Sequence, residues 1–289
     1  MNHNFWVIGS RSLTGDIGKV KAAGEVTAYD ATINKMHIAG GLNIENSSVQ
    51  KLRAAGEVNA RNAKFGDCKV AGELNVKGFG KADTLVVVGD LNAELFECRI
   101  LRNAPKKKNV NINSESSVVE FKGFIKAEIF ESLYKFRLNC TYDFKNIIST
   151  AEFFYDGILE CENFYSFGVI NIKGVNAENI YIYPASSSKL ESITGTNIVV
   201  SRSKQLDRNF KSLPKSMPNS FYARLDPLPV SLMALSSVEG DKISLDHVKA
   251  DRVSGLNVKI EDLCIIDKAE YRDKIEISEK AIVNEVIKL

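Results

Sequence analysis

Side chains that could perform acid–base, nucleophilic or metal chemistry are few and widely spaced in this chain. Its only histidines are His3, His37 and His247, and none has a catalytic or metal-binding partner at an informative spacing. His37 and His247 alternate with residues that we expect to face inward, so both are predicted to face solvent. The sequence therefore predicts no catalytic residue, no metal site and no enzyme activity.

The five cysteines show no zinc or redox spacing. Cys68, Cys98 and Cys161 fall at positions predicted to face inward, where a thiol acts as a small apolar filler. The odd cysteine count fits a reducing compartment, as does the lack of a signal peptide or of an apolar run of about 18 residues. We expect a cytoplasmic protein without a cofactor.

Three carboxylates recur at one repeat position, where Glu57, Glu73 and Asp90 each follow a glycine. If the repeats stack, these carboxylates lie about 4.8 Å apart and repel one another. A bound cation would relieve that repulsion, but the neighbouring Arg53 and Lys69 offer a simpler remedy. The favoured interpretation is a row of solvated corner charges.

The repeat itself is the strongest signal in the sequence. Its period is 16 or 17 residues, and each early copy opens with glycine, then usually an acidic residue, then an aliphatic one. The copies are Gly24-Glu25-Val26, Gly40-Gly41-Leu42, Gly56-Glu57-Val58, Gly72-Glu73-Leu74 and Gly89-Asp90-Leu91. Such regularity is typical of a solenoid, in which neighbouring repeats must stack to bury their apolar residues.

The spacing within a repeat predicts the kind of solenoid. After Gly56, inward-type residues follow in steps of two and three: the steps of two match strand alternation, and the steps of three indicate corners. We predict an all-β fold, a right-handed parallel β-helix of about 16–17 residues per turn with three short faces. Its predicted core column is Val26, Leu42, Val58, Leu74 and Leu91, and its predicted outward amide ladder is Asn43, Asn59, Asn75 and Asn92.

Continuing in steps of 17 from Gly89 reaches Lys106, Gly123, Cys140, Gly157 and Gly174, so we expect the register to persist. The predicted organisation is a main solenoid over 1–201 with an aromatic-rich, less regular middle, a proline-containing insertion or linker over 202–236, and C-terminal solenoid turns over 237–289. We expect the insertion to lie against the solenoid. The run Lys106-Lys107-Lys108 is interpreted as an exposed loop. With a net charge of +2, no nucleic-acid partner is expected.

These repeats resemble the bactofilins, a family of polymer-forming bacterial cytoskeletal proteins, in the long form found in Gram-positive bacteria. The resemblance rests on the x-Ala-Gly-Glu-Val type repeats at 23–26, 55–58 and 71–74, on residues 167–174 with 189–195, and on 239–245 through 253–255. It implies a right-handed β-helix that self-assembles without nucleotide as a cytoplasmic scaffold. The expected partner is therefore a second copy of the chain.

Both ends of the chain are candidate assembly or docking surfaces. Near the N-terminus these are Phe5, Trp6, Val7 and Ile8, and near the C-terminus Ile282, Val283, Val286 and Ile287. An open β-helix end presents unpaired backbone groups that can pair with another chain. The first group could instead be a cap or a shallow membrane anchor, which leaves a membrane-associated location and an envelope partner open. The alternative function is a β-helical binding module that recruits a protein or a peptidoglycan-associated factor, without long filaments, through the aromatic middle or the insertion.

Overall fold

The computed structural model describes residues 3–103, 119–133, 135–183, 188–201 and 232–289. Throughout these residues the regular elements are β-strands, and no helix occurs among them. None of the described segments is therefore a helix capable of crossing a membrane. The chain divides into two compact units, Met1–Ile147 and Ile148–Leu289, called here the N-terminal unit and the C-terminal unit.

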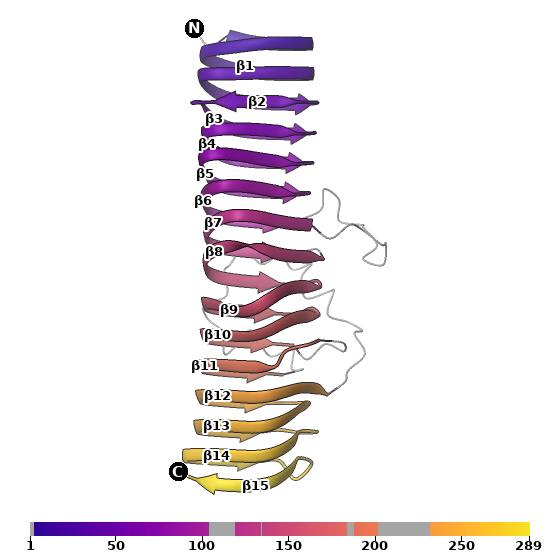
Figure 1. Cartoon of the computed structure of the whole chain (residues 1–289), viewed down its shortest axis with the longest axis vertical. Helices are drawn as coiled ribbons and strands as arrows, with labels where there is room; N and C mark the ends of the chain where they lie inside the picture. The colour runs from indigo at the N-terminus through magenta and orange to yellow at the C-terminus, as the bar shows by residue number, and fades with distance from the viewer. Residues whose placement is uncertain (1–2, 104–118, 134, 184–187, 202–231) are drawn as a thin grey trace. The chain divides into compact units, whose positions relative to one another are not determined.

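The N-terminal unit is a stack of parallel windings (Figure 1). Its strands are β1 (His3–Ala39), β2 (Leu42–Glu45), β3 (Ser48–Ala55), β4 (Val58–Ala71), β5 (Leu74–Val88), β6 (Leu91–Asn103), β7 (Val119–Ser132) and β8 (Phe136–Ser149). The ladder places Val26 beside Leu42, Leu42 beside Val58, and so on to Leu91, which confirms the predicted core column. All five residues of that column are buried. The predicted β-solenoid is confirmed.

Three corners per winding give these turns three faces. At the first corner Gly56 has a φ of 136°, and a Cβ placed on it would lie 2.3 Å from the carbonyl oxygen of Gly40, so only glycine fits this stacked position. At the second corner Asn46 and Asn62 adopt positive φ, which asparagine tolerates better than most residues. At the third the ladder skips Gln50 and Gly66.

The N-terminal unit interrupts its repeat once. Leu91 of β6 pairs with Phe121 of β7, a step of 30 residues between neighbouring windings. The predicted turn at Lys106 lies outside the described residues, and the predicted register is wrong at Gly123, which lies beside Ala93 rather than in the glycine corner column. The count in steps of 17 fails here because 30 residues separate the stacked positions Leu91 and Phe121. The interpretation of Lys106-Lys107-Lys108 as an exposed loop concerns residues outside the described ranges.

Beyond this interruption, aromatic side chains fill the core of the N-terminal unit. The Phe121 ring lies 4.7 Å from Phe136, and Phe130 lies 5.0 Å from both Phe136 and Phe144, measured between ring centroids. All four rings are buried. Tilted and edge-to-face contacts of this kind add to the burial of large apolar surface. These four aromatic side chains therefore serve packing in the core.

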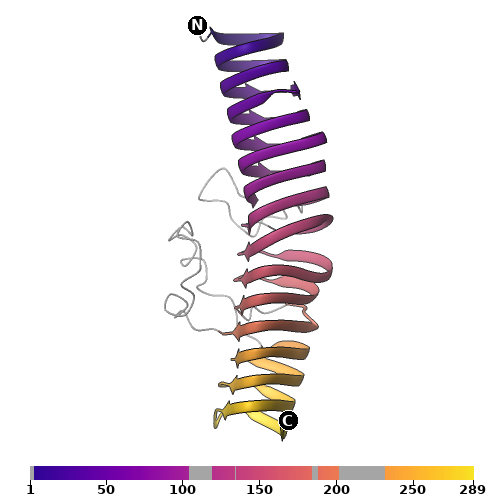
Figure 2. The same ribbon diagram turned by 90° about the vertical axis from the view of Figure 1, so that its left-hand side faces the viewer.

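The C-terminal unit is a second stack of parallel windings, which Figure 2 shows from the side. Its strands are β9 (Phe153–Ser166), β10 (Ile170–Ile182), β11 (Ser192–Val200), β12 (Met233–Leu245), β13 (Val248–Ile260), β14 (Ile265–Ile277) and β15 (Ile282–Lys288). Each strand pairs in parallel with the next. The registers of β9 with β10 and of β13 with β14 shift within the ladder, as do those of β4 with β5, β5 with β6 and β6 with β7 in the N-terminal unit.

Strand β12 follows β11 directly in the ladder, so Ser192 pairs with Ser237. Most of the predicted insertion, 202–231, lies outside the described residues, as does its expected packing against the solenoid. Solenoid pairing is already established at Met233, which lies beside Val248 of the next winding. The strand pairing of the solenoid is therefore present from the start of the described range 232–289.

Candidate functional site

The corner carboxylates of the N-terminal unit are held by amide side chains. Asn59 donates a hydrogen bond to Glu57 at 3.0 Å, and Asn92 donates one to Glu73 at 2.9 Å. Asp90 accepts the backbone N–H of Glu120 at 3.0 Å. Each of these three carboxylates therefore accepts a hydrogen bond from a neighbouring donor.

The predicted amide ladder is present and explains where those donors come from. Asn59 donates to Asn43 at 3.3 Å, Asn75 to Asn59 at 3.2 Å, and Asn92 to Asn75 at 3.0 Å. The ladder lies on the face that follows the glycine corner. It draws Glu57 and Glu73 toward that face, and away from the face that precedes the corner.

The predicted role of Arg53 and Lys69 as partners of the corner carboxylates is wrong. Neither residue takes part in an ion pair or a side-chain hydrogen bond within the part of the chain that the structure describes. The carboxylates have amide partners instead, and both cations are exposed on the preceding face. In the described ranges no three histidine, cysteine or acidic side chains gather into a possible metal site.

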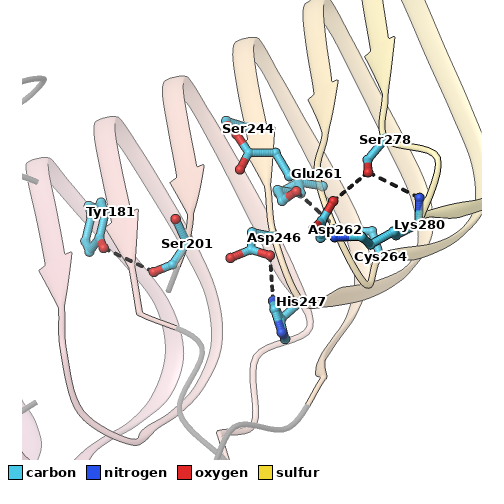
Figure 3. Close-up of polar contacts among 11 residues, drawn as sticks. Tyr181, Ser201, Ser244, Asp246, His247, Glu261, Asp262, Cys264, Ser278 and Lys280 are labelled. Carbon is cyan, nitrogen blue, oxygen red and sulfur yellow. Dashed lines mark hydrogen bonds and ion pairs between the residues drawn. The ribbon is translucent and has the colours of Figure 1, made fainter. Parts of the chain in front are cut away.

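The prediction that His247 faces solvent without a partner is also wrong. Its Nδ1 lies 2.5 Å from Oδ1 of Asp246, and both side chains are largely covered (Figure 3). His247 adopts a φ of 59° at the corner between β12 and β13, and this turn folds the ring back toward the preceding carboxylate. The partner of His247 is the preceding residue in the sequence. Strand alternation does not predict a contact between adjacent side chains.

His37 in the N-terminal unit is half-buried rather than free in solvent. Its Nε2 is buried without a hydrogen-bond partner among the described residues. Burial and the nearby cations Lys35 and Arg53 hold the pKa of His37 below its ordinary value. His3 begins β1, and its side chain lies outside the described set.

Corner residues of the C-terminal unit form a polar network over successive windings (Figure 3). Asp262 accepts hydrogen bonds from the Ser278 hydroxyl at 2.6 Å and from the Lys280 ammonium at 2.8 Å. These bonds, with the charge of Lys280, hold the pKa of Asp262 below its ordinary range. The network joins the β13–β14 corner to the β14–β15 corner, so it fastens one winding to the next.

That network does not assemble a nucleophile. Cys264 is buried, its Sγ donates to the carbonyl oxygen of Leu245 at 3.2 Å, and burial raises the pKa of its thiol to about 11. A thiol in that state carries almost no thiolate at neutral pH. The predicted inward positions of Cys68 and Cys98 are confirmed, since both are buried, whereas Cys161 is half-buried.

The last described winding leaves part of the core uncovered. Two core columns run through the C-terminal unit: Leu235, Ala250, Ile266, Val283, and Val238, Val253, Ala269, Val286. The members on β12, β13 and β14 are buried, whereas Val286 on β15 is 45% exposed and Val283 is half-exposed. Val283 and Val286 therefore occupy core positions that no described residue covers.

The other predicted C-terminal residues lie in different columns. Ile282 extends the Ile265 column and is largely exposed, and Ile287 extends the Glu270 column and is half-exposed. The structure thus divides the predicted C-terminal group into two inward residues, Val283 and Val286, and two residues outside the core columns. Only the inward pair continues the buried columns.

The predicted N-terminal group also divides. Val7 is buried, and Arg11 lies over the Phe5 ring at 4.4 Å. Trp6 and Ile8 are 78% and 93% exposed, and both line a groove of about 820 Å³ along a side of the N-terminal unit. The exposed pair therefore belongs to a lateral surface of the N-terminal unit.

No protein-family model, curated protein or solved structure matches this chain.

The C-terminal unit contains a second amide ladder, which the sequence did not predict. In the C-terminal unit Asn179 donates to Asn163 at 2.8 Å, and Asn197 donates to Asn179 at 2.9 Å. The separations are 16 and then 18 residues, so the ladder has no constant period in the sequence. Recognising it required the strand register.

Proposed function

We propose that the protein is a structural scaffold of the bactofilin type, whose β-solenoid subunits assemble end to end without nucleotide. The uncovered core columns at β15 support this proposal most directly. Full burial of a valine side chain contributes about 1.5–3 kcal/mol, and Val283 and Val286 obtain only part of that contribution within one subunit. A second subunit placed over β15 would complete both columns.

The backbone of the last winding favours the same arrangement. β15 pairs with β14, and no other strand among the described residues pairs with β15. Its outer row of N–H and C=O groups is therefore an edge of the kind that pairs with another strand. Apolar side chains at Ile277 and Leu289 are also exposed near this edge. Hydrogen bonding and apolar burial would be satisfied together by one contact.

The test is electron microscopy and sedimentation of the purified full chain and its variants. Val286→Arg is expected to shorten or abolish the assemblies, because it would bury an unpaired charge at the joint. Ile158→Arg is the matched control: Ile158 is 55% exposed on β9, away from the uncovered columns. Its assemblies are expected to resemble those of the unmodified protein.

Two outcomes would overturn the proposal. One is a monodisperse monomer at every protein concentration and salt concentration tried. The other is an assembly that survives Val286→Arg and Val283→Arg unchanged, which would place the joint elsewhere. Circular dichroism of each variant checks that the β-solenoid remains folded.

A further inference from the structure

A groove runs along the face of the N-terminal unit that precedes the glycine corner. Its volume is about 820 Å³. One row of its lining consists of small side chains, with Ala39, Ala55 and Ala71 stacked on successive windings and Val88 next in the column. Trp6 and Ile8 contribute exposed apolar surface to the same groove.

A row of basic side chains borders the small residues. His37 pairs with Arg53, and Arg53 with Lys69, in consecutive rungs of the ladder. Lys21 also lines the groove, and its ammonium lies 4.7 Å from the centre of the Trp6 ring. Adjacent strands lie about 4.8 Å apart, so the cations of Arg53 and Lys69 lie side by side along the groove, with His37 next to Arg53.

A second basic column lies beside the first on the same face. Lys35 pairs with Lys51, which then pairs with Asp67. Within the described ranges no ion pair involves Lys21, Lys35, Lys51, Arg53 or Lys69. Asp67 is the carboxylate within these two columns, so the face carries an excess of positive charge, although the whole sequence carries a net charge of only +2.

The amide ladder maintains this separation of charge. Glu57 and Glu73 follow Arg53 and Lys69 in the sequence, but their carboxylates are bonded to Asn59 and Asn92 across the corner. The positive field is felt at His37, whose pKa is lowered first by burial and then by Lys35, Arg53, Lys19 and Lys21. His37 Nε2 is also buried without a hydrogen-bond partner in the described structure, and His37 lines the groove.

We propose that this groove binds an acidic peptide segment of a partner protein, with carboxylates along the basic column and an apolar side chain against Trp6 and Ile8. Charge complementarity identifies the occupant: an unpaired row of cations beside exposed apolar side chains matches a chain that alternates acidic and apolar residues. Recruitment of such a partner is a function beyond assembly, and it uses residues of the N-terminal unit, whereas β15 belongs to the C-terminal unit.

A narrow occupant fits this face better than a broad anionic surface does. The row of carboxylates formed by Glu25, Glu57, Glu73 and Asp90 lies just across the glycine corner from the small side chains. A planar anionic membrane broad enough to cover the groove would approach these acids as well as the cations. A peptide lying within the groove would contact the basic column and avoid them.

Fluorescence anisotropy with the full chain tests the proposal. The probe is a fluorescein-labelled peptide of alternating glutamate and leucine, and its control carries glutamine in place of glutamate. We expect the glutamate peptide to bind at low ionic strength and the glutamine peptide not to bind. Because Trp6 is the only tryptophan, its emission should shift when the glutamate peptide is added.

Charge reversal locates the binding face. The double variant Lys21→Glu with Arg53→Glu is expected to weaken binding by about tenfold or more, because like charges then face each other. The matched control is Lys64→Glu with Lys77→Glu, which makes the same change in net charge at exposed positions outside the groove lining. The control should retain binding within about twofold, since screening limits the effect of distant surface charges.

Several results would overturn the proposal. One is no anisotropy change at low ionic strength, and another is equal loss of binding in both double variants. Two more are tighter binding to phosphatidylserine vesicles, or to a single-stranded oligonucleotide, than to the glutamate peptide. The last two would assign the face to a membrane or to nucleic acid. If circular dichroism shows that the reversal variant is misfolded, the neutral pair Arg53→Gln with Lys69→Gln is used, and a smaller loss of binding is still required.

Discussion

The two units place glycine at stacked corners for different physical reasons. In the N-terminal unit Gly56 combines a φ of 136° with a missing Cβ that would lie 2.3 Å from the Gly40 carbonyl oxygen. In the C-terminal unit Gly240 and Gly255 have no positive φ, but a Cβ on Gly255 would lie 2.6 Å from the Gly240 oxygen. One column needs glycine for its backbone angle and its packing, and the other for packing alone.

This difference explains why one unit is easier to read in the sequence than the other. A corner that requires both a backbone angle and close packing tolerates only glycine, so the spacing of Gly24, Gly40, Gly56 and Gly72 is regular. A corner column that needs glycine for packing alone can carry other residues at its two ends. The Gly195, Gly240 and Gly255 column accordingly begins beside Ala177 and ends beside Tyr271.

The largest loss of stability is expected from a substitution in the buried core of the N-terminal unit. Val58 is fully buried in the middle of the core column. Val58→Arg would bury an unpaired charge, so we expect the windings of β3, β4 and β5 to lose protection from amide hydrogen exchange. The adjacent Asn59 points outward, and Asn59→Arg should retain that protection. Equal protection in the two variants would contradict the assigned faces.

The next largest loss of stability is expected at the glycine corners, where substitutions compare the two units directly. Gly56→Ala should destabilise the protein by about 3 kcal/mol, because it adds backbone strain to a steric clash. Gly255→Ala should cost about 1–2 kcal/mol from the clash alone. Gly41 has no positive φ, and its nearest neighbour would be Glu25 Cγ at 3.5 Å. Gly41→Ala should therefore change the free energy of unfolding by less than about 0.5 kcal/mol, as measured by urea denaturation.

A pH-dependent effect is expected in the C-terminal unit. Glu270 is nearly covered and lies 2.8 Å from Lys268 and 2.6 Å from Arg252. Its hydrogen bonds to Lys268 and Arg252 lower its pKa from an ordinary 4.5 to about 2. The native state therefore binds this proton less readily than the unfolded state. The stabilisation is present above pH 4.5 and is lost as the pH falls toward 2.

Glu270→Gln should remove this contribution, so the loss of stability between pH 4.5 and 2 becomes shallower. Thermal unfolding at a series of pH values measures the change. Glu279→Gln, at an exposed position, is the control and should leave the acid limb as it is in the unmodified protein. Identical acid limbs in all three proteins would refute the role of Glu270.

The smallest effects are expected in the two amide ladders. Asn179 is half-buried and bonded to Asn163 and Asn197, whereas Asn59 is exposed. Asn179→Ala should cost about 1 kcal/mol, and Asn59→Ala less, because a lost hydrogen bond costs more where water cannot replace it. Urea denaturation would measure both. A larger cost at Asn59 would reverse the expected order.

Residues repeated at a constant spacing made much of the N-terminal unit predictable. The core column through Val58, the glycine corner at Gly56 and the ladder through Asn59 follow from a 16- or 17-residue spacing. The step from Leu91 to Phe121 could not be predicted, because an added segment leaves the stacking intact while shifting the count. The pairing of His247 with Asp246 depends on a corner φ that no periodicity encodes.

The terminal residues show the same limit. The sequence identified an apolar group at 282–287, but only the register with β14 shows that Val283 and Val286 continue buried columns while Ile282 and Ile287 do not. Near the N-terminus, the basic column depends on where Glu57 and Glu73 point. That direction is set by the amide ladder rather than by the spacing of charges.

Amide hydrogen exchange at the last winding tests the central claim most directly. If subunits join over the uncovered core, the amides of β15 and those of β14 near Ile277 should gain protection as the protein concentration rises. The Val286→Arg variant should show no such gain. Exchange that stays equally fast at β15 in dilute and concentrated protein, while large assemblies are present, would contradict end-to-end assembly through this edge.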